Sequence, residues 1–253
     1  MTLKKKILGF VLDCLLGFRI VSYRLKYLIK KENKKINICI STTKGYSEKT
    51  IPLLLDDLLE NGFAYESIYV FEGGYNYNKK INEKYNHYHV DHNSFDLTAL
   101  ISLIELKNDL GESDFWLLLH DTVRLTKNFK YLFNSLNTKN YDCLPLRNFP
   151  SMNIGVYSIN YLAKNSNYLI QFKNQNYSVV GLQNCKLKAI HEEDYLFKNT
   201  TNRININSDM ERFEKSKNIT YFGKRRKEEF YPQLGILKYK ANYKFSEVWS
   251  IDL

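Results

Sequence analysis

A run of apolar residues that ends in a histidine and an acid constrains the fold more than any other stretch of this chain. Phe115 to Leu119 reads Phe-Trp-Leu-Leu-Leu, and His120 and Asp121 follow at once. Five successive apolar residues suit a strand buried on both faces, as in the middle of a largely parallel sheet. Ligands of open α/β sheets bind just beyond the carboxyl ends of such strands. Asp121 is therefore the first candidate active-site residue.

An earlier strand, helix and strand give the sheet its parallel character. Residues 36–40 (Ile-Asn-Ile-Cys-Ile) predict a short strand, and the small polar run 41–45 follows it. A helix is expected to begin near Ser47 or Thr50, because apolar residues then recur at helical spacing until Asn61-Gly62. A second strand is expected over 67–71. This βαβ unit predicts a parallel pair with a right-handed crossover.

The rest of the chain predicts one α/β domain with a mostly parallel central sheet, over residues 36–253. Residues 88–90 form a short expected strand, and Asn93 or Ser94 is expected to cap a helix whose first turn contains Asp96. Beyond the buried strand the pattern predicts a helix near 127–136 and strands near 142–146 and 152–158.

The N-terminal 35 residues are a separate extension that carries most of the charge. They hold +8 of the formal net charge of +10, so the remainder of the chain is nearly neutral and a nucleic-acid partner is not expected. A helix over 3–31 mixes bulky apolar and basic residues, which is typical of a helix lying on an anionic membrane surface. Packing on the domain or an oligomer contact explains it equally well. Its apolar stretches are too short to span a membrane, and the four scattered cysteines favour a reducing cytosol. The expected location is thus cytoplasmic, at the inner face of the plasma membrane.

Two other groups of ionisable residues have ordinary explanations. Asp56-Asp57 lies in the middle of the first predicted helix, where a solvated helix face accounts for it. The sequence His87-x-His89-x-x-His92 with Asp91 has some zinc-ligand character, but alternation along a strand would by itself place His87 and His89 on one face. The P-loop, the G-x-G-x-x-G fingerprint and the G-x-S-x-G elbow are all missing from the sequence.

What remains is a set of polar residues at predicted strand ends. They are Ser41, Thr42 and Thr43 after the first strand, Glu72 after the second, and His120, Asp121 and Thr122 after the long buried one. A later acidic group, Glu192-Glu193-Asp194, precedes an apolar helical start, where it would also suit the helix dipole.

The order of these features resembles glycosyltransferases of the GT-A fold, a Rossmann-like fold, and especially the family-2-like enzymes. The resemblance covers roughly residues 36–200. It implies that Asp121 takes the place of the D-x-D motif, with one carboxylate where that motif has two, and that the donor is a nucleotide sugar. The nucleotide-binding residues that it implies are Ser41, Thr42, Thr43, Glu72, Asp96 and His120.

The resemblance also implies the chemistry. Asp121 and His191 would hold Mg²⁺ or Mn²⁺, Glu193 or Asp194 would deprotonate the acceptor hydroxyl, and Asn153 would face the acceptor. An inverting transfer to a surface glycan, lipid-linked and made in capsule or lipopolysaccharide assembly, is the expected reaction. The alternatives are a nucleotidyltransferase of similar fold and a non-enzymatic membrane-surface adaptor.

Overall fold

The computed structural model describes residues 14, 18, 36–127, 129–134, 141–145, 154–192, 194–203, 228–231 and 235–239. Of the expected N-terminal helix it describes Cys14 and Phe18, which are helical and exposed. The rest of that helix, Asn153 and Glu193 lie outside the described residues. Within the ranges that are described, no helix is long and apolar enough to cross a membrane.

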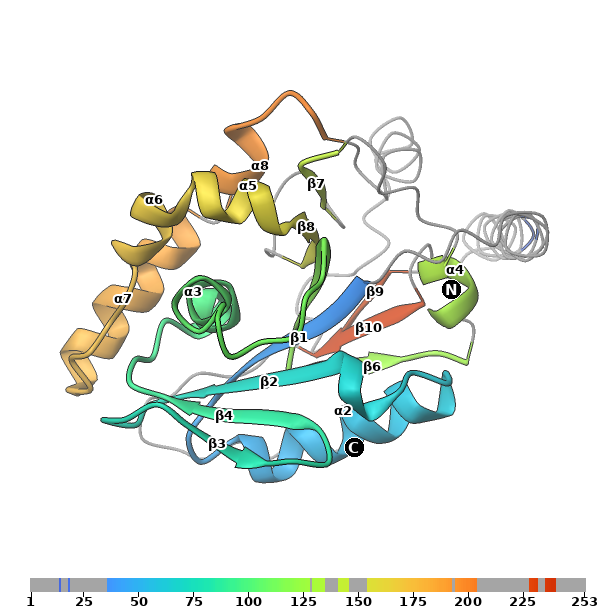
Figure 1. Cartoon of the computed structure of the whole chain (residues 1–253), viewed down its shortest axis with the longest axis horizontal. Coiled ribbons are helices and arrows are strands. Elements are labelled where there is room, and N and C mark those ends of the chain that lie inside the picture. The colour runs from blue at the N-terminus through green and yellow to red at the C-terminus, as the bar shows by residue number, and fades with distance from the viewer. Residues whose placement is uncertain are drawn as a thin grey trace, which may run out of the picture.

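The central element is a seven-stranded sheet with the strand order β3-β4-β2-β1-β5-β8-β7 (Figure 1). Its strands are β1 (Ile36–Thr43), β2 (Ile68–Gly73), β3 (Lys79–Asn82), β4 (Asn86–Val90), β5 (Phe115–His120), β7 (Cys143–Pro145) and β8 (Gly155–Ser158). Strands β4, β2, β1 and β5 pair in parallel, whereas β3 and β8 run antiparallel to their neighbours. The prediction of an α/β fold with a mostly parallel central sheet is confirmed.

The first βαβ unit forms as predicted, with one difference in length. Helix α2 (Ser47–Glu60) lies between β1 and β2, and Gly62 follows its C-cap Asn61 at a φ of 76°, a conformation that favours glycine. Strand β1 continues through Thr43, because residues 41–43 pair with Phe71, Glu72 and Gly73 of β2. The polar run 41–43 is thus strand and not loop, so its side chains alternate between the two faces of the sheet.

Several elements were not predicted from the sequence. Strand β3 forms a hairpin with β4, and the one-turn helices η1 (Tyr65–Ser67) and η2 (Phe95–Leu97) precede β2 and α3 (Thr98–Glu105). Neither Asn93 nor Ser94 caps α3 with its side chain, because η2 comes between them and the helix. The C-terminal half adds the helices α5 (Ile159–Lys164), α6 (Ser166–Ile170) and α7 (Val179–His191), whereas α8 (Tyr195–Lys198) forms where the sequence predicted a helical start after Asp194.

A second, three-stranded sheet lies next to the carboxyl end of β5. It has the order β6-β10-β9 and is built from β6 (Val123–Leu125), β9 (Glu228–Tyr231) and β10 (Ile236–Tyr239). Helix α4 (Phe129–Asn134) follows β6, near the predicted range 127–136. Strand β6 begins two residues after Asp121, so this sheet borders the predicted site.

Two apolar layers pack on the two faces of the central sheet. Leu117 and Leu119 of β5 belong to the layer under α2, whereas Trp116 and Leu118 belong to the layer under α3, α5 and α6. All four side chains are buried, which confirms that β5 is covered on both sides. Figure 1 shows α2 on one side of the sheet and α3 with α5–α7 on the other.

Candidate active site at the carboxyl end of the sheet

The strand order creates a switch point between β1 and β5. The chain leaves β1 through α2 to reach β2 on one side, and it enters β5 on the other side of β1 through α3, which covers the opposite face. The direction in which the strands are added therefore reverses between β1 and β5, and open α/β sheets bind ligands beyond the carboxyl ends of the strands at such a point. Asp121 follows β5 directly at this point.

Asp121 is held by β1 and α2. Its backbone N–H donates to the carbonyl of Ser41 at 3.2 Å. Its Oδ2 accepts hydrogen bonds from the hydroxyl groups of Thr42 at 2.7 Å and Thr50 at 3.1 Å. Residues of both elements thus fix this one carboxylate. The sequence singled out Thr42 but not Thr50, which lies near the beginning of α2.

The protein environment makes Asp121 a weaker acid than usual. Burial away from water raises the pKa of Asp121 to about 6, and the negative charge of Asp96 adds to the rise. The hydrogen bonds from Thr42 and Thr50 lower the pKa but do not offset the effect of burial. The carboxylate therefore titrates close to neutral pH. Asp96 and Asp121 also lie near enough to repel each other electrostatically.

Ser41, Asp96 and His120 meet on the opposite face of the sheet, under α3. The Ser41 hydroxyl donates to the carbonyl of Asp96 at 3.1 Å and accepts from the N–H of Ala99 at 3.0 Å. His120 is buried, and its Nδ1 lies 3.6 Å from Oδ1 of Asp96, whose side chain is 46% exposed. Thr43 is on this face too, with its hydroxyl 3.4 Å from Oδ1 of Asn93.

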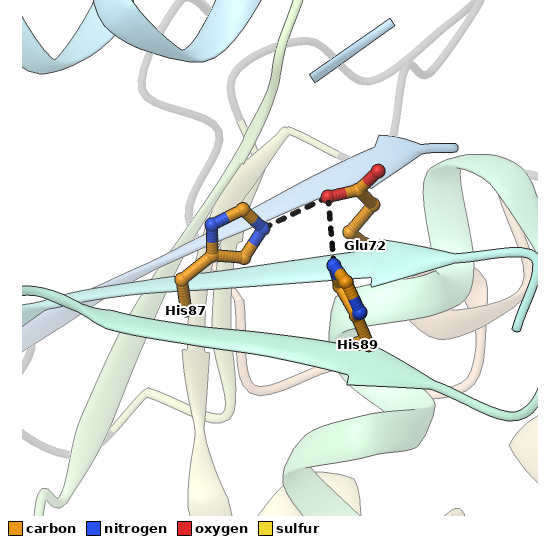
Figure 2. Close-up of side chains that lie close together, drawn as sticks. All are labelled: Glu72, His87 and His89. Atoms are coloured by element: carbon orange, nitrogen blue, oxygen red, sulfur yellow. Dashed lines mark hydrogen bonds and ion pairs between the residues drawn. The ribbon is translucent and has the colours of Figure 1, made fainter. Parts of the chain in front are cut away.

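Glu72 forms a separate cluster with two histidines of β4. Its Oε2 lies 3.0 Å from Nε2 of His87 and 3.6 Å from Nε2 of His89 (Figure 2). Its Oε1 accepts a hydrogen bond from the hydroxyl of Tyr75 at 3.0 Å. Burial would raise the pKa of Glu72, but hydrogen bonds from His87, Ser47 and Tyr75 outweigh it and the pKa is lowered.

The third histidine of the suspected zinc motif points elsewhere. His92 is buried between the hydroxyl groups of Ser94 and Ser102, and it forms a second group of potential ligands with Asp91 and Glu105. Lys173 already pairs with both of those carboxylates, at 3.0 and 2.9 Å. The set His87, His89 and His92 therefore does not converge on one point, although His87 and His89 do share a face as expected.

His191 and Asp194 lie together, in a part of the fold away from Glu72. They line an open pocket of about 210 Å³ with Glu192, Tyr195, Lys198 and Asn199. Asp194 is buried and pairs with Lys198 at 3.1 Å. Figure 1 places α8 beside β7, at the opposite edge of the sheet from β3 and β4. The predicted roles of His191 as metal ligand and of Asp194 as base stay predictions.

The interpretation of Asp57 as part of a solvated helix face was wrong. Asp57 is buried, and Arg124 of β6 donates to both of its carboxylate oxygens at 2.6 and 2.8 Å. The N–H of Leu125 also donates to Oδ2 of Asp57 at 2.8 Å. Asp56, its neighbour, is exposed as expected. No sequence signal pairs Asp57 with Arg124, because the two are brought together only when β6 packs against α2.

Comparisons with known proteins give little guidance. No family model matches this chain, and no curated protein matches it. Among solved structures, the crystal structure of S. aureus TarS residues 1–349 is similar to it at 13% identity and a TM-score of 0.30. The similarity covers 51% of this chain and 49% of that one, so the chain spans about half of that structure. A likeness at this level carries no argument about function, which must be inferred from the site itself.

Proposed function

We propose that the crevice at the ends of β1 and β5 binds the nucleoside diphosphate of a sugar donor, and that the protein is a glycosyltransferase. The observation that carries this proposal is the placement of Asp121 at the switch point of the sheet, with its carboxylate fixed by Thr42 and Thr50. Thr43, Asp96 and His120 lie at the same edge and are proposed to bind the ribose and phosphates through hydroxyl, carboxylate and imidazole groups. The Ser41 hydroxyl, which already bonds Asp96 and Ala99, would act by holding Asp96 in place. Glu72 is not needed for the proposal, because both of its carboxylate oxygens already have partners.

A Mg²⁺ or Mn²⁺ ion fits the oxygen atoms at this edge. Both threonine hydroxyls donate to Oδ2 of Asp121, so neither of them bonds its Oδ1. The half-exposed carboxylate of Asp96 lies close enough to raise the pKa of Asp121. A divalent cation would relieve that repulsion, and hard cations of this kind prefer carboxylate and phosphate oxygens. Asp121, with Asp96 nearby, would hold the ion. The ion would supply positive charge for the leaving diphosphate.

The transfer itself breaks the bond between the anomeric carbon and a phosphate oxygen of the donor. An acceptor hydroxyl forms the new bond at that carbon, its proton passes to a carboxylate, and the configuration inverts. Glu193 and Asp194 are the proposed bases. The pocket lined by His191 and Asp194, on the side of α8, is the proposed site of the acceptor, and Asn153 is proposed to face the acceptor as well.

The acceptor that we propose is a lipid-linked surface glycan at the cytosolic face of the plasma membrane. Support comes from the basic and apolar composition of residues 1–31, which suits attachment to anionic lipid. Flotation with anionic vesicles tests this: the full chain should float and a variant lacking residues 1–31 should not. If neither floats, the membrane part of the proposal is wrong.

A thermal-shift screen of nucleotide sugars, with and without Mn²⁺, tests the donor. We expect one donor to raise the unfolding temperature of the full chain and the variant Asp121→Asn to lose that shift. Asp56→Asn, which changes an exposed carboxylate on α2, is the matched control and should keep it. If Asp121→Asn still binds the donor, the crevice at Asp121 is not the donor site. Release of pyrophosphate from a nucleoside triphosphate would instead indicate a nucleotidyltransferase, and binding of no nucleotide would favour an adaptor.

A further inference from the structure

The cluster of Glu72, His87 and His89 has the composition and geometry of a metal site. Glu72 comes from β2, and both histidines come from β4, where Glu72 pairs directly with His89. Because side chains alternate along a strand, His87 and His89 point to the same face of the sheet as Glu72 (Figure 2). We propose that Oε2 of Glu72 and the Nε2 atoms of His87 and His89 bind a divalent transition metal ion of the zinc class.

The distances match those between ligands of one ion. Zinc lies about 2.0–2.1 Å from imidazole nitrogen and carboxylate oxygen, so two ligands of a tetrahedral site are separated by roughly 3.3 Å. Oε2 of Glu72 lies 3.0 Å from one Nε2 and 3.6 Å from the other. The three ligand atoms all lie within 4.8 Å of one another. A small adjustment of side chains would therefore place an ion between them.

Neighbouring side chains already orient the ligands. The hydroxyl of Tyr77 lies 3.1 Å from Nδ1 of His89, which leaves Nε2 to face Glu72. Tyr75 stacks on the His89 ring, with 3.6 Å between ring centroids and 7° between planes, and donates to Oε1 of Glu72. Outer partners of this kind, which fix the rotation of an imidazole and the direction of a carboxylate, accompany metal ligands in proteins.

The site is shielded but reachable. The side chains of Glu72, His87 and His89 are 4%, 9% and 16% exposed, so an ion can enter past His89. Two histidines and one carboxylate with a fourth position for water match the ligand sets that zinc and ferrous iron prefer, whereas Mg²⁺ prefers oxygen ligands alone. The ligand set therefore differs in kind from the oxygen ligands proposed at Asp121, although Glu72 is the strand partner of Thr42, which bonds Asp121.

The inference does not rest on the proposed function, because metal binding can be measured without any nucleotide. The full chain is stripped with a chelator, then titrated with Co²⁺ and followed by the visible absorption of tetrahedral cobalt; Zn²⁺ is added to displace it. We expect one equivalent to bind. Removal of one ligand should weaken Zn²⁺ binding by about 100-fold or more in each of the variants Glu72→Gln, His87→Asn and His89→Asn. Removal of an outer partner of a ligand weakens metal binding less, by roughly 10–100-fold.

Three further variants make the result specific. Tyr77→Phe removes only the hydroxyl that orients His89, and it should weaken binding by roughly 10-fold. Asp121→Asn and His191→Asn should bind Zn²⁺ as the unchanged chain does, because they alter the other predicted metal site. The unfolding temperature of each stripped variant is measured in parallel, so that loss of binding can be compared among variants that remain folded.

Each remaining outcome overturns the proposal. A stripped chain that binds neither Co²⁺ nor Zn²⁺ near one equivalent would show that the cluster is only a Glu-His hydrogen-bond network. Binding that is unchanged in all three ligand variants, or that is lost in Asp121→Asn or His191→Asn, would place the metal elsewhere.

Discussion

The hydroxyl of Thr42 donates a 2.7 Å hydrogen bond to Oδ2 of Asp121 and so ties the end of β1 to the turn after β5. The two residues are 79 positions apart in the chain. They meet because β1 and β5 pair in parallel, with Ser41 opposite His120. Thr42 and Asp121 are the next residues after this pair, and both face the α2 side of the sheet.

Replacing Asp121 by asparagine should raise stability and remove activity. The pKa of Asp121 is about 6 in the folded chain, against 3.8 for an unperturbed aspartate. Between these two pH values the folded chain binds the proton more tightly than the unfolded chain does. The free energy of unfolding therefore falls as the pH rises through this range. At about 1.4 kcal/mol per pKa unit, the ionised group costs up to about 3 kcal/mol at pH 7. Asp121→Asn should recover part of this in urea unfolding at pH 7, with little gain at pH 4, while donor turnover falls about 100-fold or more. A loss of stability at pH 7 would contradict the prediction.

The variant Thr42→Val should move the titration of Asp121 to higher pH. The hydroxyl of Thr42 lowers the pKa of this carboxyl, so its loss raises the pKa above about 6. NMR of the carboxyl carbon, or the acidic limb of the pH-rate profile, measures the shift. Thr43→Val is the matched control, because the hydroxyl of Thr43 points to Asn93 on the other face of the sheet. An equal shift in both variants would mean that the hydrogen bond is not the cause.

The ion pair between buried Asp57 and the partly exposed Arg124 should contribute more to stability than the neighbouring carboxylate of Asp56 does. Asp57→Asn leaves Arg124 and the N–H of Leu125 without their charged acceptor, and we expect a loss of about 2–4 kcal/mol in the free energy of unfolding. Asp56→Asn, one position away and exposed, should change it by less than about 0.5 kcal/mol. Urea denaturation of the two variants makes the comparison, and similar midpoints would refute it.

Gly73 should not tolerate a side chain. A Cβ atom there would lie 2.5 Å from the carbonyl oxygen of His92 and 3.1 Å from Cα of Asn93, both of them backbone atoms. Gly73→Ala should therefore destabilise the chain by about 1–3 kcal/mol through overpacking. Gly45→Ala has open space around it but a φ of 85°, so its cost comes from backbone strain alone and should be near ~1 kcal/mol. Thermal unfolding compares the two, and a Gly73→Ala variant as stable as the unchanged chain would contradict the steric argument.

The sequence was most informative where one local pattern decides the structure. The apolar run 115–119 predicted a strand covered on both faces, and the spacing of apolar residues predicted α2 and the parallel pair of β1 and β2; all are confirmed. It was least informative about β3, a largely exposed strand with the sequence Lys-Lys-Ile-Asn, and about helices α5–α7, of which α5 and α6 pack against the distant helix α3. Near the site, the sequence predicted that β1 ends at residue 40, because the small polar residues 41–43 suggested a turn. In the structure these residues continue the strand by pairing in parallel with β2.

Sequence alone therefore determined the type of fold and the position of Asp121 at the end of its central strand, since burial on two faces leaves a signal in adjacent residues. Tertiary structure decided which groups meet. It brought Thr42 and Thr50 to Asp121, Arg124 to Asp57, and His87 and His89 to Glu72. Strand order and register set those meetings, and both depend on the packing of the whole sheet, which no short stretch of sequence records.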